Sequence, residues 1–131
     1  MAKKEPVPIR FPPDPELGKR FADALKIAAQ FPGVEESRSY GTPAIKVKNK
    51  LIARLRSEAE GGLAIVCPFE DRDVLLEVAP DTFYITDHYA DYEFVLVNLH
   101  NVNPDQLQQL IEVAWRRVAS NKLQNEYDKG A

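Results

Sequence analysis

Apolar positions recur at helical spacing in two segments, one near each end of the chain. In the first, Asp14-Pro15-Glu16 has the N-cap, the N1 proline and the first-turn acid that are typical of a helix start. Apolar residues then lie on one helical face: Leu17, Phe21, Ala24, Leu25 and Ala28. This pattern predicts a helix that ends at Phe31-Pro32-Gly33.

The second helical pattern follows Asn103-Pro104-Asp105-Gln106, which has the spacing of a capping box. One apolar face follows it: Leu107, Leu110, Ile111, Ala114, Trp115 and Val118. The residues from Asn121 onward are mostly polar, so we expect them to form a frayed tail.

Between these helices the apolar residues follow strand patterns. Segments 45–48 and 51–56 alternate around Asn49, which predicts a hairpin with one apolar side: Ile45, Val47, Leu51, Ala53 and Leu55. The continuous apolar run 63–67 predicts an interior strand. Segments 83–86 and 94–99 predict two more strands, and a short acidic helix is expected over 69–78.

The order α-β-β-β-α-β-β-α with short connections predicts a mostly antiparallel sheet packed by helices, in a single α+β domain. We place this domain at residues 14–123. A proline-rich arm (1–13) precedes it and a polar tail (124–131) follows it.

Composition narrows the class of protein. A chain of 131 residues fits one domain. It has no apolar run near the ~18 residues of a membrane helix, and no secretory signal is visible. Cys67 is the one cysteine, so an internal disulfide is excluded and a cytoplasmic location is expected. The net charge of -3 argues against strong, indiscriminate DNA binding.

Charge is distributed unevenly along the chain. Residues 1–60 hold 12 basic and 8 acidic residues, whereas residues 61–110 hold 1 and 9. Such asymmetry can mark a basic surface that binds a partner, although charges on solvated faces give the same pattern.

Several segments together resemble the MmcQ/YjbR family. They are Pro32-Gly33-Val34-Glu35-Glu36, residues 39–47, residues 50–55, residues 83–89 and residues 114–119. The resemblance covers roughly residues 17–123. It implies a compact fold similar to that of CyaY, the bacterial frataxin, with a double-wing arrangement that is commonly labelled DNA-binding. It supplies no catalytic residues, and we expect neither an enzyme nor a cofactor.

The strongest candidate for binding is the predicted hairpin, whose cations alternate with core residues and should share the solvent face: Lys46, Lys48, Lys50, Arg54 and Arg56. Three cations near the C-terminus could extend this patch: Arg116, Arg117 and Lys122. A two-stranded ribbon can lie along DNA phosphates. The cations could equally protect an exposed sheet edge.

From this hairpin we expect a monomer that binds double-stranded DNA weakly, with a Kd on the order of 10⁻⁴–10⁻⁶ M at physiological salt. The alternative is a module that binds an acidic protein partner through the same hairpin.

A second candidate is a cleft formed by Tyr40, His88 and Tyr89. A histidine beside acids can act as a base or ligand, but a hydrogen-bonded histidine that fixes its loop is the favoured interpretation. Cys67 ends an apolar strand, so we expect it to be buried rather than to act as a nucleophile.

The acidic residues of the middle segment could in principle bind a hard cation: Glu70, Asp71, Asp73, Glu77, Asp81, Asp87, Asp91 and Glu93. Their spacing matches no metal-binding loop, so we interpret them as a solvated face and expect no metal site.

Overall fold

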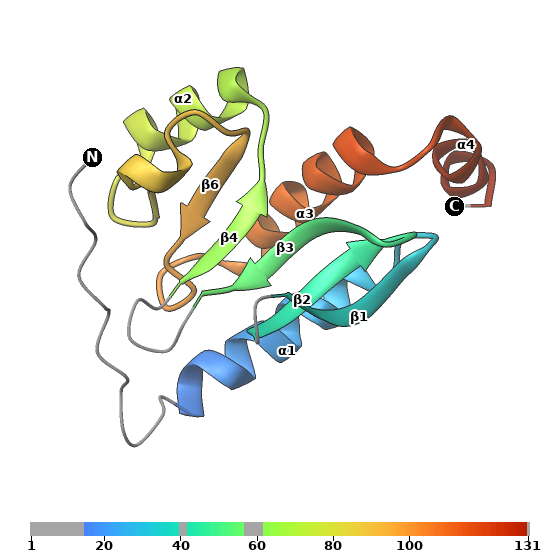
Figure 1. Cartoon of the computed structure of the whole chain (residues 1–131), viewed down its shortest axis with the longest axis horizontal. Coiled ribbons are helices and arrows are strands. Elements are labelled where there is room, and N and C mark those ends of the chain that lie inside the picture. Colours follow the sequence, from blue (N-terminus) through green and yellow to red (C-terminus); the bar gives the residue numbers. More distant parts are fainter. Residues whose placement is uncertain (1–14, 40–41, 57–61, 131) are drawn as a thin grey trace.

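The computed structural model describes residues 15–39, 42–56 and 62–130, and shows a six-stranded antiparallel sheet with helices packed against it (Figure 1). The strand order is β1-β2-β3-β4-β6-β5. The strands are β1 (Val34–Ser39), β2 (Thr42–Val47), β3 (Lys50–Leu55), β4 (Leu63–Val66), β5 (Phe83–Tyr84) and β6 (Phe94–Val97). The helices are α1 (Pro15–Ala28), α2 (Phe69–Val78), the short 3₁₀ helix η1 (Asp87–Tyr89), α3 (Pro104–Val118) and α4 (Asn121–Gly130). The predicted α+β class is confirmed.

Helices α1 and α3 contact each other and cover one face of the sheet (Figure 1). Their apolar faces meet the inward residues of the central strands, and Trp115, Ile111 and Ile65 are completely buried there. The opposite face carries a smaller apolar cluster in which Ala64 and Leu96 are covered by Tyr89. The sheet therefore has one face closed by helices and one face covered in part by aromatic side chains.

The predicted helices are confirmed, and local chemistry explains their limits. At the start of α3, the Asn103 side chain accepts from the Gln106 amide (2.8 Å) and the Gln106 side chain accepts from the Asn103 amide (3.2 Å). This is the predicted capping box. Past the end of α1, Gly33 adopts a φ of 79°, a conformation that glycine reaches without a steric cost. The proposed N-cap Asp14 lies outside the described residues.

Besides the short 3₁₀ helix η1, a strand and a helix were absent from the predicted order. Strand β1 has the polar sequence VEESRS and pairs with β2 alone, at the edge of the sheet. The segment expected to fray is instead helix α4. Its Leu123 is buried, and its Tyr127 ring lies 5.0 Å from the Phe31 ring and 5.4 Å from the Trp115 ring. Two apolar residues one turn apart therefore hold α4 to the core.

The core-facing side of the hairpin differs from the prediction at Leu51. Its two-residue turn has positive φ at both Lys48 (47°) and Asn49 (74°), as a type I′ turn requires. A bulge then shifts the β2–β3 register, so that Lys46 lies opposite Leu51 while Ile45 lies opposite Ala53. Ile52 consequently enters the core, and the prediction that Leu51 faces the core was wrong.

Candidate functional site

The candidate site lies on the sheet face that points away from α1 and α3, which we call the outer face. Residues paired across antiparallel strands share a face, and the register aligns Ala44, Arg54, Ala64, Leu96 and Tyr84 across five strands. Lys46 and Leu51 form the neighbouring pair. The outer face therefore combines basic, apolar and aromatic residues.

The two hairpin arginines are held by hydroxyl groups on this face. Arg54 is partly buried and donates to the Thr42 hydroxyl (3.2 Å) and the Tyr89 hydroxyl (3.4 Å). Arg56 is only 8% exposed and donates to the Tyr84 hydroxyl (3.4 Å). The expectation that Arg56 shares a solvent-exposed face was therefore wrong, because Tyr84 and its surroundings cover this end of the hairpin.

The three hairpin lysines are more accessible. Lys48 and Lys50 are exposed at the turn, and Lys46 is partly exposed on the outer face, where Glu35 of β1 is its register partner. Within the described part of the chain, none of these lysines forms an ion pair. Their positive charge is therefore available to an anionic partner.

The C-terminal arginines differ from these lysines because their charges are compensated. Arg116 pairs with Glu112 and with Asp128, each at 2.9 Å, and Arg117 pairs with Glu93 at 2.7 Å. The hydrogen bond from Arg116 lowers the pKa of Asp128. Lys122 is exposed on α4. The proposed extension of the basic patch therefore rests on two arginines that carboxylates already engage.

A groove of about 460 Å³ crosses the outer face beside Arg54. It is lined by Leu51, Arg54, His88, Tyr89, Tyr92 and Phe94. The His88 ring meets the Tyr89 ring edge-on at 4.8 Å, and Tyr92 is 60% exposed. The structure thus brings together His88 and Tyr89 of the predicted cleft, whereas Tyr40 lies outside the described residues.

His88 does not fix its loop as expected. Its side chain is exposed and forms no hydrogen bond among the described residues. The loop is instead held by Arg72 of α2, a buried residue whose Nη1 donates to the carbonyls of Tyr89 (3.1 Å), Tyr92 (2.9 Å) and Phe94 (3.2 Å). Its Nη2 donates to the Ala90 carbonyl (3.0 Å).

Arg72 is the positioning residue that sequence reasoning missed. It stands among the acids of α2, where an exposed ion pair would be the ordinary explanation for a lone arginine. One signal was present, because Arg72 is the single lysine or arginine between positions 61 and 110. A lone cation in so acidic a segment can mark a specific structural contact rather than a solvated face.

Cys67 is buried, as expected, and does not pair with His88. It is 1% exposed and borders a different hollow, between α2 and α3. Burial raises the pKa of Cys67 to about 12, and the negative charges of Asp71 and Glu93 act in the same direction. The positive charge of Arg72 opposes this shift. The thiol is therefore neutral near physiological pH.

We expect iodoacetamide at pH 8 to modify Cys67 at least about 100-fold more slowly in the native protein than in the urea-unfolded protein. Both the buried position and the raised pKa suppress the reactive thiolate. Mass spectrometry of quenched samples gives the two rates. Similar rates in the two states would contradict a buried, neutral thiol.

The acidic residues of α2 and of the loop around η1 are exposed, apart from the partly buried Glu93. Among the described residues, no three His, Cys, Asp or Glu side chains are grouped so that they could hold a metal ion. Likewise, no helix in the described ranges has the length and apolar character of a membrane span.

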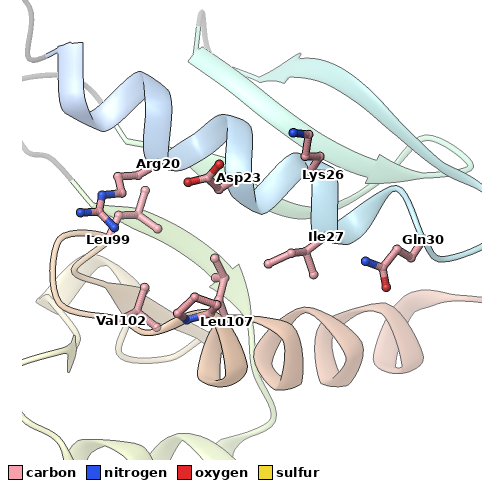
Figure 2. A pocket seen from close by; sticks show the side chains of 9 residues that line it. Arg20, Asp23, Lys26, Ile27, Gln30, Leu99, Val102 and Leu107 are labelled. Carbon is pink, nitrogen blue, oxygen red and sulfur yellow. The ribbon is translucent and has the colours of Figure 1, made fainter.

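A further hollow, of about 320 Å³, lies between α1 and α3 on the closed side of the sheet (Figure 2). Ile27 and Leu107 approach it from the two helices, and charged side chains of both signs from α1 border it, including Arg20 and Asp23. Because charges of both signs border this hollow, it favours neither an anionic nor a cationic ligand. The three hairpin lysines, by contrast, favour an anion.

These features define a small α+β domain with one helix-covered sheet face and one outer face that bears a basic hairpin and an aromatic groove. The chain belongs to the YjbR family, whose family model matches residues 29–117. That span contains the entire sheet, the hairpin and the groove, and it confirms the resemblance seen in the sequence. The search of curated proteins gave no match.

Proposed function

We propose that this YjbR-family protein is a non-enzymatic nucleic-acid-binding protein that contacts phosphates through the β2–β3 hairpin. The observation that carries the proposal is the group formed by Lys46, Lys48 and Lys50, which make no ion pair within the described residues. Phosphate contacts by lysine position a protein on nucleic acid without reading its sequence. We therefore expect little sequence preference.

The expected affinity is low. Three lysine–phosphate contacts correspond to a log-log salt slope of about -2.7 on duplex DNA, which supports only weak binding at physiological salt. The net charge of -3 and the register position of Glu35 beside Lys46 reduce it further. We also propose a cytoplasmic location, with which a chain that has one cysteine and therefore no internal disulfide is compatible.

The test is a triple variant with Lys46→Gln, Lys48→Gln and Lys50→Gln. We expect it to bind duplex DNA more weakly, with a salt slope about 2.7 smaller in magnitude, because three phosphate contacts are lost. Fluorescence anisotropy at several salt concentrations measures both quantities. Stability should change little, since these side chains are not buried.

The matched control removes three lysines elsewhere: Lys19→Gln and Lys26→Gln on α1, with Lys129→Gln on α4, all of them exposed. Its net charge equals that of the hairpin variant, so a general charge effect would weaken both proteins equally. Equal salt slopes for the two variants would move the contact surface away from the hairpin.

A second candidate function is binding of an acidic protein partner through the same three lysines. It is favoured by the mixed charge around them, because Glu35 beside Lys46 suits a discrete pattern of charges better than a uniform polyanion. If the parent protein bound no DNA even at low salt, this function would replace the first.

A further inference from the structure

The groove on the outer face has a lining that phosphate contacts alone do not explain. Tyr92 exposes 60% of its surface, and the His88 ring beside it is also exposed, with 6.5 Å between the two ring centres. Exposed apolar surface with a polar rim is typical of ligand-binding grooves. Tyr89 and Phe94 continue the aromatic lining into the groove.

Arg54 gives the groove a positive, planar group at a fixed position. Its guanidinium donates to the hydroxyls of Thr42 and Tyr89 and lines the groove itself. Guanidinium planes and aromatic rings are the surfaces on which proteins stack unpaired bases. The groove volume of about 460 Å³ also lies in the range of small-molecule sites.

We propose that this groove binds an unpaired nucleobase, so that the protein prefers single-stranded to duplex nucleic acid; this inference rests on the function proposed above. The faces of a base within a duplex are covered by its neighbours, and only a single strand presents them at no unstacking cost. Tyr92 and His88 supply the stacking surface, and Arg54 meets the polar edge of the base or its phosphate.

The surroundings of the groove set the path of the strand. Leu51 lines the groove and is the register partner of Lys46, so the hairpin lysines border it on one side. Asp87 and Asp91, both exposed, are chain neighbours of His88 and Tyr92 on the other side. Repulsion by these carboxylates directs the phosphates toward the hairpin.

The test compares a single-stranded DNA, a single-stranded RNA of the same sequence and the corresponding DNA duplex by fluorescence anisotropy at one salt concentration. We expect at least one single strand to bind about 10-fold more tightly than the duplex. The single strand that binds more tightly shows whether the groove prefers a base of DNA or of RNA. Tyr92→Ala should weaken single-strand binding by about 5- to 100-fold and leave duplex binding unchanged.

Tyr92→Phe is the matched control, because it keeps the ring and should keep the preference for single strands. Equal affinity of the parent for both single strands and the duplex, or an unchanged single-strand affinity of Tyr92→Ala, would overturn the inference. In either case, duplex binding that depends on the three hairpin lysines would leave the proposed function in place. Absence of binding to all three probes at low salt would overturn both.

Discussion

Replacing Arg72 by Met is expected to lower the free energy of unfolding by about 3–5 kcal/mol, because buried carbonyls lose hydrogen bonds from a charged donor. The guanidinium of Arg72 is buried and donates to four backbone carbonyls between Tyr89 and Phe94. Met matches the length of the side chain but supplies no donor, so all four carbonyls lose the bond to Arg72. The carbonyls of Tyr89 and Tyr92 then keep only their backbone donors, the amides of Tyr92 and Phe94. Urea denaturation followed by circular dichroism measures the change.

Arg72→Lys is the informative control for this variant. Lysine keeps the charge but lacks the planar fork of donors, so it should recover only part of the lost stability. Hydrogen exchange should show faster exchange of the Tyr89 and Tyr92 amides in both variants, because both amides lie in the loop that Arg72 holds. A loss below about 1 kcal/mol in Arg72→Met would contradict this role.

The same substitution separates the two halves of the candidate site. His88 and Tyr92 belong to the loop that Arg72 anchors, whereas the hairpin lysines belong to strands held by the sheet. Arg72→Met should therefore abolish a preference for single strands while the salt slope on duplex DNA persists. Such a result would show that the groove on the outer face depends on Arg72, a side chain of α2.

The sequence predicted those elements whose local signals agree with their tertiary roles. The capping box at Asn103 and the apolar stripe after it defined α3, and the apolar run at 63–67 identified the fully buried strand β4. Asn49 marked the hairpin turn. In each case, one short segment holds both the pattern and its physical cause.

The missed features depend on partners distant in sequence. Strand β1 has no apolar alternation, and only its pairing with β2 makes it a strand. Helix α4 is held by Leu123 and Tyr127, whose contacts lie on α3 and on the chain after α1. The bulge that exchanges Leu51 for Ile52 in the core has no sequence signature that the hairpin pattern could reveal.

The candidate site follows the same rule. Alternation placed Lys46 and Arg54 on one face, and the structure has them there. The hydrogen bonds from Arg54 to Tyr89 and from Arg56 to Tyr84 join the end of the hairpin to residues 35 and 28 positions away, which spacing alone does not show. The groove is a property of this tertiary contact, so it emerged only with the fold.

Trp115→Ala is expected to cost about 3–5 kcal/mol of unfolding free energy, the ordinary loss for a large buried aromatic residue. The Trp115 side chain is 0% exposed, and its Nε1 donates to the Pro32 carbonyl at 2.9 Å. Its ring lies 5.2 Å from Phe31 and 5.4 Å from Tyr127. Removal leaves a cavity where α3, α4 and the end of α1 meet.

Trp115→Phe separates the cavity from the hydrogen bond. It keeps much of the volume and the contacts with Phe31 and Tyr127, and it loses the bond to Pro32, so we expect about 1–2 kcal/mol. Urea denaturation must be followed by far-ultraviolet circular dichroism, because Trp115 is the only tryptophan. Equal losses in the two variants would assign the effect to the hydrogen bond rather than to packing.

Because Trp115 lies on the helix-covered side, variants that remain folded should keep the parent's salt slope on DNA. A changed salt slope would contradict this expectation and would show that packing around Trp115 affects the binding surface on the outer face.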